Sequence, residues 1–123
     1  MRLAFLSILW LSGFAGLAGE RLTSLPDRAT NAPTGSEFVQ RITPADFAER
    51  EQQVFSEITA GNVPDFLRQF QPVTVTHVSS GQTNIATFFV APDYLAVGTD
   101  EDFFLAPMTP MTAQRIADQF GCT

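Results

Sequence analysis

The first eighteen residues constrain this chain most, because they carry the pattern of a secretory signal peptide and not of a folding domain. Arg2 supplies a positive end, and the stretch from Leu3 to Phe14 is dominated by apolar side chains. Gly16 and Ala18 place small side chains at the −3 and −1 positions of a cleavage site. We therefore expect cleavage after Ala18, which leaves residues 19–123 to fold.

A retained transmembrane anchor is the alternative interpretation of this segment. The strongly apolar stretch is shorter than the ~20 residues that span a bilayer as a helix, and no cluster of basic residues follows it. Glu20 stands where a bacterial lipoprotein would carry its lipid-bearing cysteine. The sequence therefore predicts a secreted or periplasmic protein with no stable membrane anchor after cleavage.

The rest of the chain has enough apolar residues to form a core, and its negative net charge disfavours anionic ligands. Hydrophobic residues make up 45% of the sequence and twelve residues are Phe, which argues against a disordered chain. Thirteen acidic residues face seven basic ones, all arginine, for a net charge of −6. Nucleic acids and anionic membranes require a basic face. Because the arginines are scattered, we expect no nucleic-acid partner.

Capping residues and apolar spacing predict helices on both sides of a strand region. Residues 19–36 resemble a linker or extended arm, which Leu22 and Leu25 would attach to the domain. Ser36 is the expected cap of a short turn over 37–42. Thr43 is the expected cap of the clearest helix, followed by Pro44 and Asp46 and stopped by Gly61. The residues expected on its apolar face are Phe47, Val54, Phe55 and Ile58.

Two further helical segments complete this set. Residues 64–70 form a short helical piece that Pro72 closes. The last helix begins at Thr109 and Pro110 and ends at Gly121. Its expected core residues are Met111, Ile116 and Phe120.

Between these helices the apolar period changes to that of strands. Residues 73–78 alternate and are rich in β-branched side chains, and a turn at 79–82 leads into a second strand over 83–91. We expect Ile85 and the run Phe88-Phe89-Val90 near its buried centre. Residues 94–97 and 103–106 form a further hairpin.

These elements predict an α+β fold with N-terminal helices, an antiparallel sheet of about four strands and a C-terminal helix. The connections between strands are too short for crossover helices, so the sheet must be antiparallel, and helices would cover one of its faces. The expected organisation is a signal peptide over 1–18, an arm over 19–36 and one small domain over 37–123. Whether that domain is truncated at its C-terminus stays open.

A resemblance supports the fragment interpretation. The stretch Ala91–Phe103 is similar to a family of exported bacterial proteins of unassigned function, and so are residues 33–38, 61–66, 107–114 and 121–123. In that family the chain continues past the cysteine into a second part. The resemblance implies that this chain is an N-terminal portion, and that any catalytic groups would belong to the part beyond it.

Few residues are suited to catalysis or metal binding. His77 is the single histidine and the catalytic candidate, either as a general base or as a metal ligand. A metal site needs about three protein ligands, so we expect no metal and no cofactor. Pairing His77 with Cys122 as a nucleophile is disfavoured, because the thiol follows a helix C-terminus. The acidic loop Asp100-Glu101-Asp102 lacks calcium-loop spacing and is interpreted as a solvated hairpin tip.

Aromatic side chains are the binding candidates. Within a strand, neighbouring side chains point to opposite faces, so one ring of each Phe pair would face the core and the other would face outward. An outward ring offers a surface for a protein or a glycan. Packing beneath a covering segment is the simpler interpretation. The candidates are Phe88, Phe89, Tyr94, Phe103 and Phe104.

Three functions compete on these observations. The favoured one is an exported, non-catalytic module that binds a protein or glycan through an aromatic sheet face. The alternative is the N-terminal part of a cell-envelope hydrolase whose active site is completed by further sequence. The third is a small inhibitor or structural protein with a protruding loop at 98–102. The sequence contains no Gly-x-Ser-x-Gly elbow and no phosphate-binding glycine loop, which favours a protein that is not an enzyme.

Overall fold

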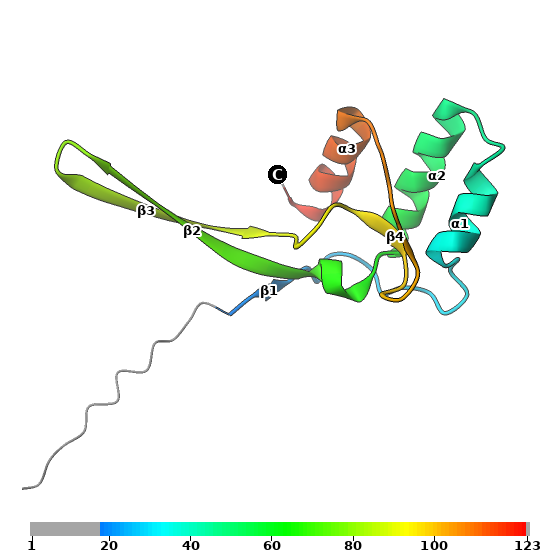
Figure 1. Cartoon of the computed structure of the whole chain (residues 1–123), viewed down its shortest axis with the longest axis horizontal. Helices are drawn as coiled ribbons and strands as arrows, with labels where there is room; N and C mark the ends of the chain where they lie inside the picture. The colour runs from blue at the N-terminus through cyan, green and yellow to red at the C-terminus, as the bar shows by residue number, and fades with distance from the viewer. Residues whose placement is uncertain (1–17, 123) are drawn as a thin grey trace, which may run out of the picture.

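Three helices and two antiparallel sheets make up the α+β fold, seen in a computed structural model that describes residues 18–122 (Figure 1). The predicted fold class and the C-terminal helix are confirmed. The predicted signal peptide lies outside the described residues except for Ala18, which is exposed. No helix within residues 18–122 is long and apolar enough to cross a membrane.

Helix α1 (Gly35–Ile42) begins two residues before the predicted start at Glu37. Its N-cap is Thr34, whose hydroxyl accepts from the backbone N–H of Glu37, while the Glu37 carboxylate accepts from the backbone N–H of Thr34. This reciprocal pair satisfies two N–H groups of the helix end. Ser36 is therefore inside the helix, and its expected role as a cap is wrong.

Helix α2 (Phe47–Thr59) begins at Asp46, whose carboxylate accepts from the backbone N–H of Glu49 at 2.9 Å. The predicted cap, Thr43, closes α1 instead, because its hydroxyl donates to the carbonyl of Val39 at 2.7 Å. Helix α3 (Pro110–Phe120) has the predicted N-cap Thr109 and ends at Gly121 in the left-handed conformation, with φ 70°. Both ends of α3 are confirmed.

Helices α1 and α2 pack their buried sides against a two-stranded sheet. Strands β4 (Ala96–Gly98) and β5 (Phe103–Leu105) pair with each other. Helices α1 and α2 contact β4, and α3 packs against α2. The shared core contains, among others, Phe38, Val54, Ile58, Ala96, Val97 and Ile116. We call this unit, residues 22–68 and 91–122, the body.

Two predicted core residues lie outside this core. Phe47 is 69% exposed and Met111 is 77% exposed, so both predictions are wrong. Each residue lies in the first turn of its helix, at the end away from β4 (Figure 1). The helical period places these side chains correctly around the helix axis. It does not show that the neighbouring elements end before reaching them.

The predicted arm, residues 19–36, is packed onto the rest of the body. Strand β1 (Glu20–Arg21) pairs with the start of β2. Leu25 is buried and Leu22 is partly buried, which confirms that these two residues attach the arm. The guanidinium of Arg68 holds the same segment, because it donates to the carbonyls of Leu25 and Pro26 at 3.2 and 2.8 Å.

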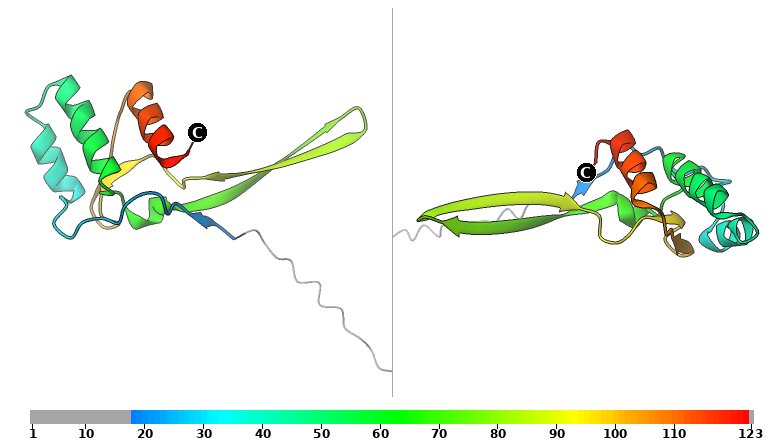
Figure 2. Two further views of the ribbon diagram at one scale, coloured as in Figure 1. Left: turned by 180° about the vertical axis from the view of Figure 1, so that it is seen from behind. Right: turned by 90° about the horizontal axis from the view of Figure 1, so that it is seen from above.

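The remaining strands leave the body as one long hairpin. A single 3-10 turn, η1 (Asp65–Arg68), leads directly into β2 (Gln69–Ser79), which pairs with β3 (Gln82–Val90). In all three ribbon views these strands project away from the helices (Figures 1 and 2). We call residues 69–90 the hairpin. The strands therefore form two separate sheets, where the sequence predicted one sheet of about four strands.

Candidate interaction surface

A two-residue turn, in which both residues have positive φ, connects the strands of the hairpin. Ser80 has φ 52° and Gly81 has φ 77°, the backbone of a type I′ turn, whose twist matches that of the flanking strands. The turn fixes the register, with Ser79 opposite Gln82 and every later pair following in step as far as Gln71 opposite Val90. The two strands are therefore paired along their full length by a defined turn.

Both faces of the hairpin are exposed. Side chains directly opposite each other lie on the same face of an antiparallel pair, so Val73, Val75, Phe88 and Val90 share one face. The other face carries Thr74, Thr76, Val78, Ile85 and Phe89. Phe88 is 55% exposed and Ile85 is 68% exposed. The expected burial of Ile85 and of Phe88 to Val90 is wrong, because no helix within residues 18–122 covers either face.

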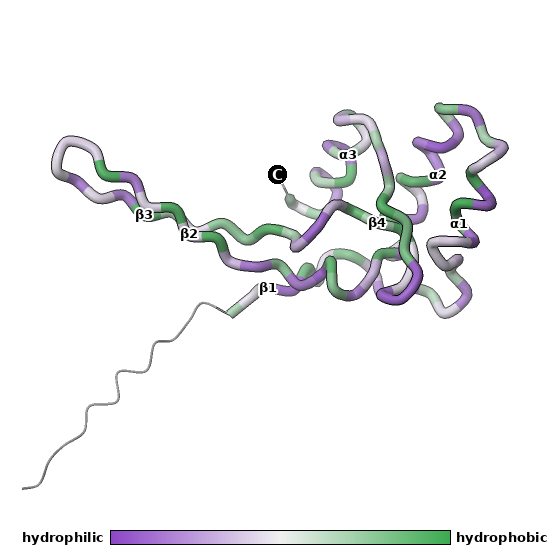
Figure 3. The backbone as a smooth tube through the Cα atoms, viewed as in Figure 1, coloured by the Kyte–Doolittle hydropathy of each residue, from purple (hydrophilic) through white to green (hydrophobic). Residues whose placement is uncertain are grey.

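The hairpin also lacks charge. No Asp, Glu, Lys or Arg occurs from Gln69 to Pro92, and Figure 3 shows apolar and weakly polar positions along most of both strands. Exposed strands normally carry charged side chains that prevent sheets from pairing edge to edge. This stretch is the signal that the sequence analysis missed. An uncharged pair of strands is normally interpreted as buried.

The two outer edges of the hairpin differ. In a hairpin closed by a two-residue turn, the pair beside the turn is hydrogen-bonded and pairs then alternate. The N–H groups of Thr83, Ile85, Thr87 and Phe89 therefore point away from β2, along a β3 edge that no described strand covers. On β2, the corresponding edge is interrupted by Pro72 and covered at its base by β1. The β3 edge is thus the more complete template for another strand.

His77 lies far along the hairpin, away from the other candidate catalytic side chain, Cys122. It is exposed and stands opposite Asn84. The thiol of Cys122 contacts the carbonyl of Phe120 at 3.9 Å, and no hydrogen bond within residues 18–122 joins it to His77. Among those residues no group of three or more His, Cys, Asp or Glu is placed to hold a metal ion. Within the described residues His77 and Cys122, whose pairing the sequence disfavours, are not hydrogen-bonded to each other.

The five aromatic candidates divide between the hairpin and the body. Phe88 and Phe89 lie on β3, and Tyr94, which follows it, is 81% exposed. Phe104 packs on Phe38 with ring centroids 6.2 Å apart, and Phe103 contacts Phe66 edge-on at 5.3 Å. The expected division into one inward and one outward ring holds for Phe103 and Phe104 only.

Tyr94 lines an open apolar hollow of about 500 Å³ beside the body. Leu105 and Met108 line its walls, and Ala113 of α3 lines it as well. Among the described residues that line it none is charged, and the Tyr94 hydroxyl is the one side-chain oxygen or nitrogen group. The hollow therefore offers little to orient a small polar substrate.

The acidic loop at residues 100–102 is not only a solvated hairpin tip, because two of its carboxylates form hydrogen bonds with other parts of the body. Asp100 accepts from the backbone N–H groups of Asp65 and Phe66. Asp102 accepts from the backbone N–H and hydroxyl of Ser36 at 3.0 and 2.9 Å. Hydrogen bonds from Thr34 and Ser36 hold the pKa of Asp102 below its ordinary value. These carboxylates fasten η1 and the start of α1, and Glu101 remains exposed.

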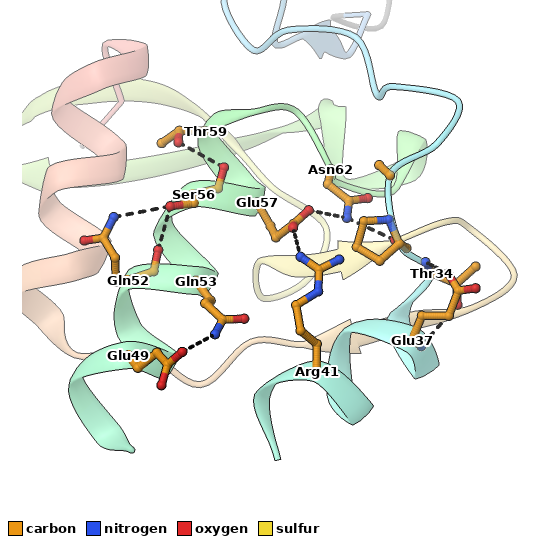
Figure 4. A network of polar contacts seen from close by, with 12 residues as sticks. Thr34, Glu37, Arg41, Glu49, Gln52, Gln53, Ser56, Glu57, Thr59 and Asn62 are labelled. Carbon is orange, nitrogen blue, oxygen red and sulfur yellow. Dashed lines mark hydrogen bonds and ion pairs between the residues drawn. The ribbon is translucent and has the colours of Figure 1, made fainter. Parts of the chain in front are cut away.

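The remaining polar contacts in the body link structural elements. Glu57 on α2 accepts from Arg41 of α1 at 2.6 Å and from Asn62 at 2.8 Å, and Asn62 also donates to the carbonyl of Pro33 (Figure 4). Arg28 of the arm donates to the Asn62 side-chain oxygen at 2.8 Å. This network joins two helices and the arm, and Asn62 at its centre is buried. It leaves the hairpin as the main candidate surface.

Comparison of the chain with protein-family models, with curated proteins and with solved structures gave no match. The resemblance to exported bacterial proteins accordingly stays a prediction. The functional argument rests on the geometry and chemistry of the hairpin.

Proposed function

We propose that this chain is an exported, non-catalytic module that binds a protein partner by adding the hairpin to a β-sheet. The observation that carries the proposal is the hairpin itself, whose two strands project from the body, bear no charge and have an open β3 edge. The body supplies a folded support, and the hairpin supplies main-chain donors and acceptors with apolar side chains beside them.

The physical reason is the low stability of such an element alone. A two-stranded hairpin is at best marginally stable in water, and here Val73, Val75 and Phe88 are exposed, with no layer of described residues over them. A partner strand would satisfy the outward N–H and C=O groups of β3, and its side chains would shield the apolar faces. This is the mode of binding in which main-chain hydrogen bonds give affinity and side chains give specificity.

A protein partner fits this surface better than a glycan does. The face that carries Phe88 also carries Val73, Val75 and Val90, without charged side chains near the ring. Sugar hydroxyls require polar groups that fix their orientation beside an aromatic platform. An uncharged strand edge instead offers regularly spaced N–H and C=O groups, which match those of another strand.

Export is the second part of the proposal, and it has its own test. The mass of the protein recovered from cells that produce the whole chain should correspond to an N-terminus at Gly19. Recovery of the intact Met1 form from the cytosol would contradict export. It would leave the proposal about the hairpin unaffected.

Photo-crosslinking tests the binding surface directly. A photoreactive phenylalanine analogue would replace Ile85, which is 68% exposed on the hairpin, or Phe47, which is 69% exposed on the body. Because the two positions are equally accessible, they are matched controls. We expect defined protein adducts from position 85 and none from position 47. Equal labelling at both positions, or no adduct at position 85, would count against the proposed function.

A further inference from the structure

We propose that the partner of the hairpin is a second copy of this chain, and that two copies join β3 to β3 as one four-stranded antiparallel sheet. This inference rests on the proposed function and names its partner. The order of strands in the dimer is β2–β3–β3–β2. A two-fold axis perpendicular to the sheet relates the copies, which makes the contact self-complementary and closed.

The choice of edge follows from the two sides of the hairpin. Thr83, Ile85, Thr87 and Phe89 present an unbroken row of outward N–H and C=O groups on β3. The β2 edge presents Pro72, which has no N–H, and β1 covers Gln69 and Phe70 nearer the base. Pairing is therefore directed to β3, and the β2 edge limits growth beyond two copies.

The distribution of charge favours a second copy over an unlike partner. All thirteen acidic residues and all seven arginines lie outside the segment 69–92, so these charges belong to the rest of the chain, mostly to the body, and not to the hairpin. Antiparallel pairing of the hairpins places the two acidic bodies at opposite ends of the joint sheet, where they repel least. The hairpin has no charge with which to select an oppositely charged partner, and none that would oppose an identical strand.

The residues of β3 also suit pairing with themselves. The register that uses the whole strand is centred on Ala86, opposite Ala86 of the second copy. It places Ile85 opposite Thr87 and Thr83 opposite Phe89, each an apolar or aromatic side chain beside a β-branched one, and such pairs stabilise sheets. All four outward-facing residues of β3 then fall at hydrogen-bonded positions.

A lipid surface is a poorer occupant. Within hydrocarbon the outward N–H and C=O groups of β3 would be left without partners. The turn at Ser79 to Gln82 is polar, and no Lys or Arg lies on the hairpin to meet anionic headgroups. A second β3 edge instead satisfies the same main-chain groups.

Proline substitution at one edge or the other tests the pairing. Thr87 and Thr74 lie directly opposite each other, share a hydroxyl contact at 3.0 Å, and both point their N–H outward. Thr87→Pro removes a donor from the β3 edge, and Thr74→Pro removes one from the β2 edge, with the same loss of the hydroxyl contact. Sedimentation of protein produced from the whole chain should show a dimer whose dissociation constant rises at least tenfold in Thr87→Pro. Thr74→Pro should change it less than threefold.

Cysteine crosslinking tests the register, in a Cys122→Ser background. Ala86→Cys would place two thiols opposite each other on neighbouring strands, where Cα atoms at a non-hydrogen-bonded pair lie about 4.5 Å apart, within disulfide range. Val75→Cys places a thiol on the same face directly across from Ala86. In the dimer the two Val75 positions are three strand spacings apart, about 14 Å. A glutathione redox buffer should link Ala86→Cys at least tenfold faster than Val75→Cys.

The outcomes separate this inference from the proposed function. A monomer at every concentration, equal sensitivity to both proline variants, or equal crosslinking of both cysteine variants would overturn the β3–β3 dimer. If position 85 nevertheless yields adducts with a different protein, the hairpin is still a binding element and the second copy is not its partner. A monomer without adducts at position 85 would overturn both.

Discussion

The carboxylate of Glu51 on α2 accepts hydrogen bonds from both the backbone N–H and the hydroxyl of Thr109, the N-cap of α3, at 3.1 and 2.8 Å. The hydroxyl of Thr112 also donates to this carboxylate. A glutamate from one helix thus completes the cap of another. Burial raises the pKa of Glu51, but the hydrogen bonds from Thr112 and Thr109 outweigh it, and the net pKa lies below the ordinary value of 4.5.

Replacing Glu51 by Ala should lower the free energy of unfolding by about 1–3 kcal/mol at neutral pH, because it leaves the N–H of Thr109 without its partner. Since the folded-state pKa is lowered, this stabilisation is present above about 4.5 and is lost as the pH falls through the folded value. Denaturant unfolding should therefore show a difference between wild type and Glu51→Ala that shrinks on acidification. Exposed Glu101→Ala is the control, and a pH-independent difference would contradict this assignment.

Replacing Arg68 by Met should destabilise the body by about 2 kcal/mol or more. The buried guanidinium donates to the carbonyls of Leu25, Pro26 and Gly61, and methionine offers no donor. Arg41→Met, which removes an ion pair with Glu57, should cost no more than about 1 kcal/mol. The measurement is the unfolding midpoint in urea. Equal losses for the two variants would show that the arm is not held by Arg68.

Replacing Gly61 by Ala should destabilise the protein more than replacing Gly121 by Ala. Both glycines have positive φ, 84° and 70°, so each substitution carries a similar conformational cost of about 1 kcal/mol. At Gly61 the added methyl group would also overlap the carbonyl oxygen of Pro26, whereas at Gly121 it would meet no atom within 4 Å. Thermal unfolding of the two variants would measure the difference. Identical melting temperatures would mean that the arm shifts freely away from Gly61.

Truncating Phe88 should leave the body intact. Phe88 is 55% exposed on the hairpin, so Phe88→Ala should change the unfolding free energy of the isolated chain by less than about 0.5 kcal/mol at concentrations below association. Phe38 is fully buried, and Phe38→Ala should cost about 3–5 kcal/mol. Calorimetry of the two variants tests this contrast. A large loss from Phe88→Ala would show that the hairpin packs on the body.

Local signals predicted the elements of this fold well where one residue could play only one role. Thr109 with Pro110 and Gly121 set both ends of α3, and Ser80-Gly81 set the turn between β2 and β3. The start of α1 was harder, because Ser36 and Thr34 are both good caps. Glu37 makes Thr34 the cap, because its carboxylate accepts a hydrogen bond from the N–H of Thr34. Sequence spacing alone could have indicated this pair.

The position of the hairpin was not predictable from strand periodicity. Val73 and Val75 alternate with threonines in the way that a half-buried strand does, and Phe88 followed by Phe89 is typical of a central strand. Periodicity reports which side chains share a face and says nothing about what lies opposite that face. Among the predicted aromatic candidates, Phe88 and Phe89 belong to the surface that the structure reveals. The residues missed were those of the β3 edge, Thr83, Ile85 and Thr87.

The junction between η1 and β2 has a mechanical consequence. The hairpin extends about 30 Å from the body if its strands have ordinary rise, and β2 starts at Gln69, directly after the buried guanidinium of Arg68. The hairpin joins the body at two places, through Arg68 and Gln69 before β2 and through residues 91–95 after β3, so a transverse force near Ser80 produces a large bending moment at this base. Contacts at the base must resist that moment, among them the hydrogen bonds from the Arg68 guanidinium to three backbone carbonyls.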